Sequence, residues 1–339
     1  MNLVERPQLK RLNFVFRWDA GKKVGNGHFM RCMVLSTELI KRGHAVTVLT
    51  REIPIFLLSL LNHLGIVSHS IAMESDGLAE LSDINQLYKI DWLVIDHYDI
   101  EIKWENDARQ FASRIMVIDD LANRKHNCEI LLDQNVPNCI QLGYAKLVPI
   151  QCVQALGWSY LLARPSFYAK STQHRSGTLV FLGGGDHSQA LFSLIKNLIK
   201  RTEYHPLRVL VTSDYLPITY WQSLVGDTGD VECDLVEPVS MYRSSAIAVV
   251  RCGFVSYELA LLGIPAVHIY TSDIQAEVAK ELENRNMGIA LQAVQLQNPK
   301  MLNLALQQVA LINPKPLNEQ LRPGASLVAE ILEQINEYQ

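Results

Sequence analysis

Apolar and polar positions alternate along the chain as short strand-like runs, each followed by a segment with helical periodicity. The run 12–17 (LNFVFR) is followed by 28–43, where apolar residues recur at helical spacing up to Gly43. Further strands are predicted over 44–50, 66–72, 91–98, 114–120 and 128–135, with helices between them. This alternation predicts a parallel sheet covered by helices on both faces.

The pattern restarts after a connector at 155–177. Strands are predicted over 178–186, 207–212, 231–237, 246–253 and 264–271, and the tail from 299 to 338 has a helical pattern. We therefore predict an α/β fold with two Rossmann-like domains facing across a cleft, a favoured place for a ligand. The expected domains are 1–155 and 156–339, with the C-terminal helices in the second.

The most apolar run, 53–65, contains only about ten near-continuous apolar positions, whereas a membrane span needs roughly 20. We predict a buried helix there, so that membrane association is possible only as docking. The N-terminal MNLVERPQLKR lacks the apolar core of a secretory signal, and we expect a cytoplasmic protein.

Composition changes this picture little. The net charge of -4 gives no broad electrostatic case for nucleic-acid binding. The six cysteines have no CxxC spacing, so that neither a zinc site nor a disulfide framework is indicated, and we expect reduced thiols.

Polar residues gather where the predicted strands of the first half end, which is where ligands bind in such sheets. They are Arg17 to His28, Asp96 to Tyr98, and Asp119 with Asp120. His28 begins a helix, whose dipole disfavours imidazolium, and a neutral imidazole is what a general base requires. The alternative is an ordinary loop histidine. Asp19 in the same loop could orient the ring or the substrate.

Asp119 and Asp120 could form a carboxylate pair for a metal or for substrate hydroxyls, or Asp119 could cap a turn. Because no further His, Asp or Glu spacing supports a metal, we expect none.

Two motifs in the second half join a strand to a helix. In 183–187 (GGGDH), Gly184, Gly185 and Asp186 could contact a diphosphate or sugar, or form a tight turn with Asp186 as helix cap. The stretch is not GxGxxG, so NAD is not inferred. In 251–258 (RCGFVSYE), Glu258 could accept hydrogen bonds from a ribose diol or lie at the surface.

Gln275 follows the next strand, where its side-chain amide could reach a sugar or simply face water.

The stretch 16–32 (FRWDAGKKVGNGHFMRC) resembles the opening motif of the UDP-2,4-diacetamido-2,4,6-trideoxy-β-L-altropyranose hydrolases of pseudaminic acid biosynthesis. Further similar motifs follow in family order: VIDHYDI (94–100), VIDDLANRKHNCEILLDQN (117–135), YLLARPSF (160–167), FLGGGD (181–186), SYELALLGIP (256–265), Gln275 and LRPGAS (321–326). The opening motif and the DDLANR block are the most specific. The motifs of the second half are shared with the wider glycosyltransferase-B (GT-B) superfamily.

The resemblance implies that UDP binds mainly to the second domain and the sugar to the first. His28 would activate a water that attacks the anomeric carbon and displaces UDP with inversion, with Asp19 and Tyr98 as further catalytic residues. No metal or cofactor is implied. Substrate contacts would come from Arg17, Gly27, Arg31, Gly184, Gly185, Asp186, Arg251, Cys252, Gly253, Ser256, Tyr257, Glu258 and Gln275. The product would be a diacetamido-trideoxy hexose for nonulosonic-acid synthesis, used in flagellin or surface glycans.

The chain departs from the family pattern in the loop before Glu258, where Phe254 replaces a small residue and Arg251 is added. Arg251 could pair with a phosphate, and Phe254 could crowd it. Trp18 also replaces a usually small residue beside Asp19. A GT-B glycosyltransferase and a non-catalytic nucleotide-sugar-binding protein are the alternative functions. The sequence makes no prediction of oligomeric state.

Overall fold

The computed structural model describes residues 10–21, 27–135, 143–183, 188–212, 216–235 and 237–337. In these ranges the first half of the chain forms a sheet of seven strands in the order β3-β2-β1-β4-β5-β6-β7, all parallel. The strands are β1 (Asn13–Trp18), β2 (Ala45–Thr50), β3 (Val67–Ser70), β4 (Ile90–Asp96), β5 (Ala112–Ile118), β6 (Ile130–Asp133) and β7 (Val153–Leu156). The intervening helices are α1 (Gly27–Lys41), α2 (Ile55–His63), α3 (Leu78–Leu87) and α4 (Ile102–Ala108).

The second half forms a parallel sheet in the order β10-β9-β8-β11-β12-β13. Its strands are β8 (Thr178–Phe181), β9 (Leu207–Val211), β10 (Gly229–Cys233), β11 (Ile247–Arg251), β12 (Ala266–Tyr270) and β13 (Gly288–Gln292). The helices are α6 (Pro165–Tyr168), α7 (Ser188–Leu198), α8 (Ile218–Val225), α9 (Val239–Arg243), α10 (Phe254–Leu262), α11 (Asp273–Asn284), α12 (Pro299–Val309) and α13 (Gly324–Glu337).

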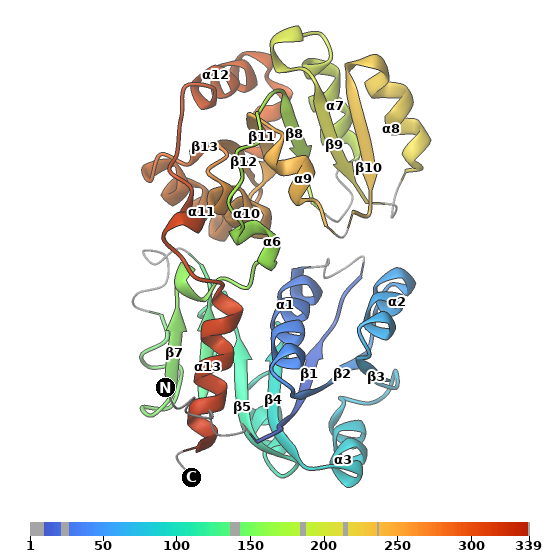
Figure 1. Cartoon of the computed structure of the whole chain (residues 1–339), viewed down its shortest axis with the longest axis vertical. Coiled ribbons are helices and arrows are strands. Elements are labelled where there is room, and N and C mark those ends of the chain that lie inside the picture. Colours follow the sequence, from blue (N-terminus) through green and yellow to red (C-terminus); the bar gives the residue numbers. More distant parts are fainter. Residues whose placement is uncertain are drawn as a thin grey trace, which may run out of the picture.

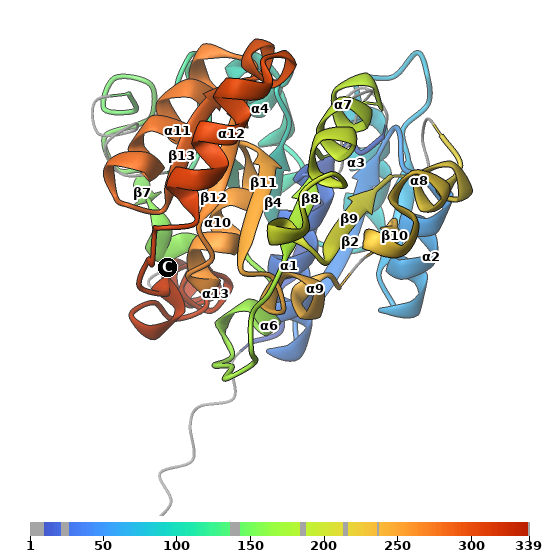
Figure 2. The same ribbon diagram turned by 90° about the horizontal axis from the view of Figure 1, so that it is seen from above.

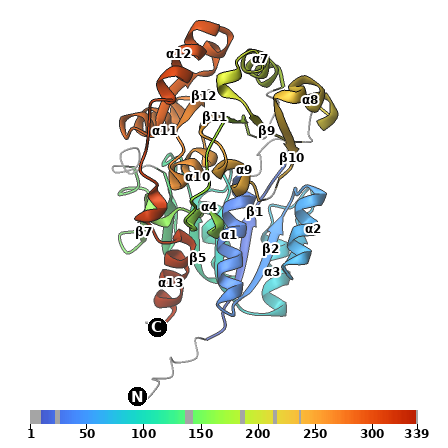
Figure 3. The same cartoon turned by 45° about the horizontal axis from the view of Figure 1, so that its top comes forward.

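The two domains are stacked along the long axis of the molecule, with the second above the first in Figure 1. Figure 2 shows the second domain from above, lying over the first, and Figure 3 gives the intermediate view. In each sheet the strand order reverses beside its first strand, between β1 and β4 and between β8 and β11. The predicted α/β fold with two facing Rossmann-like domains is confirmed.

The sequence predicts that all C-terminal helices belong to the second domain. The last helix, α13, packs on the first domain instead. Ala325, Val328, Ala329 and Leu332 of α13 belong to the core of the first domain, and the helix lies beside that sheet in Figure 1. The chain thus returns to the first domain after α12, because the apolar face of α13 packs on α1.

Three further details differ from the sequence patterns. The patterns missed β7, an edge strand with two exposed residues, and β13, a strand that begins with glycine. Helix α2 is predicted to be buried, but only one face of it is. Leu57 and Leu61 are buried, whereas Ile55 is 77% exposed. Within the described ranges, no helix combines the length and apolarity needed to cross a bilayer.

A buried ion-pair cluster fastens α13 to the first domain. Glu333 accepts hydrogen bonds from Arg42 Nη1 at 2.9 Å and from His44 Nε2 at 3.0 Å, while His44 Nδ1 accepts from the Leu12 N–H at 3.3 Å. His44 and Glu333 are both less than a tenth exposed, so that removal of Glu333 leaves the buried His44 Nε2 without its acceptor, while Arg42 keeps Glu38.

We expect Glu333→Ala to lower the free energy of unfolding by about 1–3 kcal/mol in urea denaturation, the cost of unsatisfied buried groups. Glu330→Ala on the same helix is the control. Its side chain is 37% exposed, and loss of its pair with Arg322 should cost less than about 1 kcal/mol. Equal losses in the two variants would contradict the role of Glu333 as a buried anchor.

Candidate active site

Two adjoining cavities lie between the domains, with volumes of about 440 and 410 Å³. Both are lined by residues of the two domains, and they share Gly27, Tyr98, Cys252, Gly253, Phe254 and Gln275. Because the shared residues come from α1, the end of β4 and the start of α10, the cavities form one continuous cleft at the carboxyl ends of the strands.

His28 lines the smaller cavity and is held by Asp96 at the end of β4. Its Nδ1 lies 2.5 Å from Asp96 Oδ1, and its ring contacts Tyr98 edge-on with centroids 4.7 Å apart. Because the chain turns from β1 into α1 at the strand-order reversal, residue 28 lies directly beside the end of β4. With Nδ1 donating to Asp96, Nε2 is the nitrogen that can accept a proton.

Asp96 is completely buried and is surrounded by donors. Arg31 donates to it through Nε at 2.6 Å and Nη2 at 2.5 Å, and Cys32 Sγ lies at 3.4 Å. Burial alone would raise the pKa of Asp96, but Arg31 and then His28 outweigh it and hold the pKa well below its usual range. Asp96 is therefore ionised, with Arg31 as its main countercharge and His28 as a further hydrogen-bond partner.

Arg31 also connects His28 to the opposite wall of the smaller cavity. Its Nη1 donates to Asp120 Oδ2 at 2.9 Å, and the Tyr98 hydroxyl donates to the same oxygen at 3.4 Å. Tyr98 is 43% exposed, so its ring is available to a bound ligand. The smaller cavity thus has a histidine, a guanidinium, a phenol and a carboxylate around one space, a set suited to a ligand rich in hydroxyl or amide groups.

The larger cavity is lined mainly by the second domain. Phe181, Val211 and Leu235 follow the strand ends of the second sheet around it. Glu258 on α10 is nearly buried and pairs with Arg164 Nη2 at 2.5 Å. Burial raises the pKa of Glu258, and Arg164 opposes this shift. A pocket that combines apolar side chains with the Glu258 and Asp234 carboxylates is suited to a nucleoside, whose sugar hydroxyls can donate to Glu258.

The segment before α10 joins the two cavities. Phe254 is the first residue of α10 and lines both. Arg251, at the end of β11, lines the larger cavity. Since α10 begins here, the positive end of its dipole and the Arg251 guanidinium converge where an anionic group could bind.

Ser256 and Tyr257 brace this segment. Ser256 is fully buried, and its Oγ lies 3.0 Å from His268 Nδ1, away from both cavities. The Tyr257 hydroxyl donates to Asn135 Oδ1 of the first domain at 2.8 Å. Gln275 lines both cavities, and its Oε1 accepts from the Thr271 N–H at 2.9 Å.

Asp19 and Arg17 form a separate cluster. Arg17 donates to both Asp19 oxygens, at 2.8 and 3.0 Å. Asp19 also accepts from the Arg51 N–H at 2.7 Å and from His97 Nε2 at 3.0 Å. Burial opposes these donors, yet the pKa of Asp19 is strongly lowered. The cluster ties the ends of β1, β2 and β4 together.

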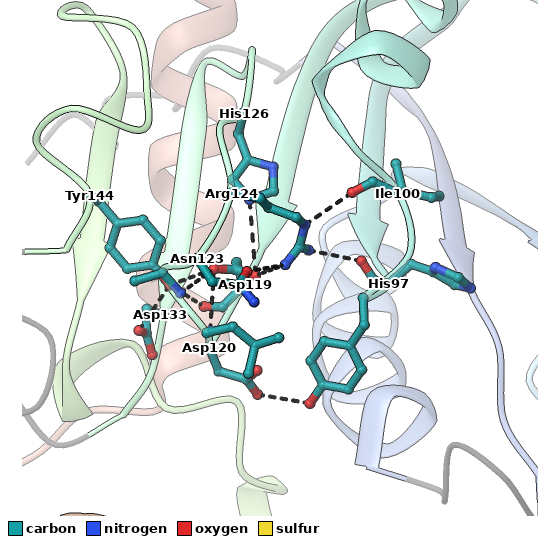
Figure 4. Close-up of polar contacts among 12 residues, drawn as sticks. His97, Ile100, Asp119, Asp120, Asn123, Arg124, His126, Asp133 and Tyr144 are labelled. Carbon is teal, nitrogen blue, oxygen red and sulfur yellow. Dashed lines mark hydrogen bonds and ion pairs between the residues drawn. The ribbon is translucent and has the colours of Figure 1, made fainter. Parts of the chain in front are cut away.

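A buried polar network lies behind the smaller cavity (Figure 4). Asp119 Oδ2 accepts from the Ala122 N–H at 2.9 Å and lies 2.8 Å from the Tyr144 hydroxyl, which is 3.2 Å from Asp133 Oδ2. Burial, with the nearby Asp120 and Asp119 carboxylates, raises the pKa of Asp133 to about 7 despite the hydrogen bond from the Asn135 N–H. Because the hydroxyl of Tyr144 has one proton, a protonated Asp133 can donate to it while it donates to Asp119.

Comparison with known proteins identifies relatives of this arrangement. No protein-family model matches the chain. The UDP-2,4-diacetamido-2,4,6-trideoxy-beta-L-altropyranose hydrolase of Campylobacter jejuni is 28% identical over 193 residues, which are 56% of this chain and 66% of that protein. The chain is similar to this hydrolase over that part of its length.

Solved structures show the fold to which this chain is similar. MurG of Acinetobacter baumannii superposes with a TM-score of 0.63 and 14% identity, covering 96% of this chain and 100% of MurG. The spinosyn rhamnosyltransferase SpnG superposes with a TM-score of 0.60 and 12% identity, covering 94% of this chain and 99% of SpnG. These identities show the fold alone, which is the GT-B arrangement of two Rossmann-like domains.

The sequence-predicted residues separate into three groups. Those that line the cleft are Gly27, His28, Arg31, Tyr98, Arg251, Cys252, Gly253, Tyr257, Glu258 and Gln275. Asp19, Arg17 and Ser256 lie behind it, so that the residue orienting His28 is Asp96 and not Asp19. Gly184, Gly185 and Asp186 lie outside the described residues, although Gly183 lines the larger cavity.

Sequence reasoning missed the partners of the predicted residues. Asp96 and Asp120 were noted as strand-end carboxylates without a link to His28 or Arg31, and Arg164 was noted only within its motif. In each case the signal is a charged residue at a strand end or in the connector. A buried charge of the opposite sign needs such a partner, because an unpaired buried charge is unfavourable. Among the described residues, no three His, Cys, Asp or Glu side chains group as they would around a metal ion.

The raised pKa of Asp133 predicts a pH dependence of stability. The folded protein holds this proton up to about pH 7, whereas an unfolded aspartate releases it at about pH 3.9. The stabilising contribution is therefore complete below about pH 4 and is lost as the pH rises towards 7. We expect Asp133→Asn, which cannot ionise, to become more stable relative to the wild type between pH 5 and 7.5.

Urea denaturation at several pH values measures this difference. Asp107→Asn, at an exposed position of α4, is the control for the substitution itself. A stability difference between Asp133→Asn and wild type that does not change with pH would rule out the buried, proton-holding carboxyl.

Proposed function

We propose that the protein hydrolyses a UDP-sugar to UDP and the free sugar. The observation that carries the proposal is the His28–Asp96–Arg31 constellation on the smaller cavity, continuous with the larger cavity that holds Glu258. The matched part of the C. jejuni hydrolase is only 66% of that protein's length, so its activity is transferred here as part of this proposal.

The nucleotide half of the proposal rests on the second domain. Uracil and ribose occupy the larger cavity, with the ribose hydroxyls donating to Glu258. The diphosphate lies against Arg251 and the first turn of α10, whose N–H groups and dipole favour an anion. The same groups stabilise the negative charge that develops on UDP as it leaves.

The sugar half rests on the first domain. A water at His28 Nε2 attacks the anomeric carbon: the water oxygen forms a bond to that carbon, the bond to the diphosphate oxygen breaks, and the water proton passes to Nε2. Attack from the face opposite UDP inverts the anomeric configuration. Asp96 fixes the ring and its tautomer, while Arg31, Tyr98 and Asp120 hold the sugar. The scheme requires no metal or cofactor.

The substrate we propose is UDP-2,4-diacetamido-2,4,6-trideoxy-β-L-altropyranose or a stereoisomer, as a step of pseudaminic or another nonulosonic acid synthesis. The smaller cavity supports this choice, because Arg31, Asp120, Gln134 and Asn135 offer both donors and acceptors to acetamido groups. Phe254, at the junction of the two cavities, contributes an apolar contact beside the anomeric carbon.

A glycosyltransferase is the second candidate, and one observation favours it. Leu57 of the apolar helix α2 lines the larger cavity, and Ile55 on the same helix is 77% exposed, as an acceptor-docking surface would be. Addition of an acceptor distinguishes the reactions, since a transferase forms more glycoside than free sugar. A non-catalytic binder would bind the UDP-sugar in calorimetry without turnover.

We expect wild-type protein to release UDP from the diacetamido UDP-sugar, and His28→Ala to lower kcat by about 10²- to 10⁴-fold, the usual contribution of a general base. UDP affinity should stay within about twofold, because UDP contacts the other domain. His63→Ala, at an exposed position of α2, is the control and should retain wild-type kcat. The proposal is wrong if the wild type releases no UDP, or if His28→Ala is fully active.

Asp96→Asn separates the orienting role from the base itself. An amide cannot accept from both Arg31 and His28 as the carboxylate does, so the ring loses its fixed tautomer, and we expect kcat to fall at least about 10²-fold. Thermal melting should show a lower Tm, since the buried Arg31 keeps only Asp120 as a countercharge. Cys32→Ser is the control, because it keeps a donor near Asp96, and it should retain activity. A wild-type kcat in Asp96→Asn would contradict the role of Asp96 in orienting His28.

A further inference from the structure

The DDLANR block, 119–124, is a specific motif whose last residue has no place in the proposed reaction. Arg124 lines neither cavity, and its side chain is only 13% exposed. We propose that Arg124 is a positioning residue, which clamps the turn after β4 to the turn after β5 and so places Tyr98 and Asp120 around the sugar. This inference rests on the proposed function and names what shapes its sugar site.

The guanidinium spans the two turns with separate nitrogens (Figure 4). Nε donates to the Ile100 carbonyl at 3.1 Å, and Nη2 donates to the His97 carbonyl at 3.0 Å. Nη1 pairs with Asp119 Oδ1 at 2.6 Å. The two carbonyls flank Tyr98, and Asp119 precedes Asp120, so that each site residue has an anchor point next to it in the chain.

The second turn is held in a conformation that it would not adopt freely. Ala122 has φ of 47°, in the left-handed region that is unfavourable for a residue with a Cβ. Asp119 Oδ2 accepts the N–H groups of Leu121 and Ala122, at 3.3 and 2.9 Å, and stabilises this turn. Strain kept in place by surrounding contacts is typical of sites that need a fixed geometry.

The clamp also reaches the end of β1. His97, whose carbonyl Arg124 holds, contacts Asp19 through its own side chain at 3.0 Å. Asp19 in turn holds Arg17 at the end of β1. The ends of β1, β4 and β5 are therefore cross-braced behind the smaller cavity, and Arg124 is the member that joins β4 to β5.

A lysine at this position distinguishes positioning from a structural ion pair. Lysine keeps the charge that pairs with Asp119, but its single nitrogen cannot reach two carbonyls and a carboxylate as the planar fork does. If Arg124 only balances the charge of Asp119, Arg124→Lys behaves as wild type. If Arg124 positions the turns, lysine fails almost as completely as glutamine.

The experiment measures steady-state hydrolysis and binding for wild type, Arg124→Lys and Arg124→Gln. We expect kcat/KM for UDP-2,4-diacetamido-2,4,6-trideoxy-β-L-altropyranose to fall about 10- to 100-fold in both variants, mainly through kcat, as displacements of about 1 Å can cause. UDP affinity by calorimetry should stay within about twofold, because the second domain is untouched.

The matched control is Arg109→Lys in the same domain. Arg109 also pairs with a carboxylate, Glu129, and donates to a loop carbonyl, that of Asn127, at 2.7 Å, but it lines neither cavity. We expect wild-type kcat/KM from this variant. Asp119→Asn is a second route to the same result, since it weakens the clamp while an oxygen still accepts the turn N–H groups.

Wild-type kinetics in Arg124→Lys, or an equal loss of UDP and UDP-sugar affinity, would overturn the inference. Failure of both Arg124→Lys and Asp119→Asn to fold would also overturn it, because the role would then be structural only. If wild type binds the UDP-sugar without hydrolysing it, the proposed function fails separately. In that case the test of the Arg124 clamp is the ratio of UDP-sugar affinity to UDP affinity in calorimetry. A lower ratio in Arg124→Lys than in wild type supports the clamp, and an unchanged ratio overturns it.

Discussion

The candidate site depends on one buried charge, the Asp96 carboxylate at the end of β4. A carboxylate with no exposure to water is strongly unfavourable unless donors surround it. Here Arg31 supplies two nitrogens and the countercharge, and His28 supplies a third nitrogen. Asp96 lies at the end of β4, whereas His28 and Arg31 lie in the first turns of α1. The interactions of the two α1 residues with the Asp96 carboxylate therefore fix how the helix packs against the end of the strand. The orientation of His28 follows from this constraint.

The fold makes that meeting possible. Because the strand order reverses between β1 and β4, the chain leaving β1 enters α1 beside the end of β4, and the helix start and the strand end converge. The second sheet repeats the reversal between β8 and β11, where Arg251 and α10 lie. The two reversals face each other, so the cleft has a charged, hydrogen-bonding wall on one side. The other wall combines apolar side chains with Arg251, Asp234 and Glu258.

The sequence predicts the architecture well, since strand–helix alternation depends on local patterns of apolar residues. It also points to His28, Tyr98 and Glu258, because position at a strand end is readable from the same patterns. The partners of these residues are harder to predict. Asp96 and Asp19 both follow apolar strands, and nothing local shows that Asp96 meets His28 while Asp19 meets Arg17 and His97. Likewise α13 has an amphipathic pattern that does not say which domain it packs against.

A direct contact joins the two walls of the cleft and bears on how the site is completed. The Tyr257 hydroxyl on α10 meets Asn135, whose N–H in turn donates to Asp133 in the network behind the smaller cavity. Helix α13 and the segment before α6 carry the chain back and forth between the domains on one side. In the proposed reaction, a nucleotide in the larger cavity would therefore contact a helix that already reaches the first domain through Tyr257. The proposed position of the anomeric carbon would then depend on Phe254 from one domain and on His28 and Tyr98 from the other.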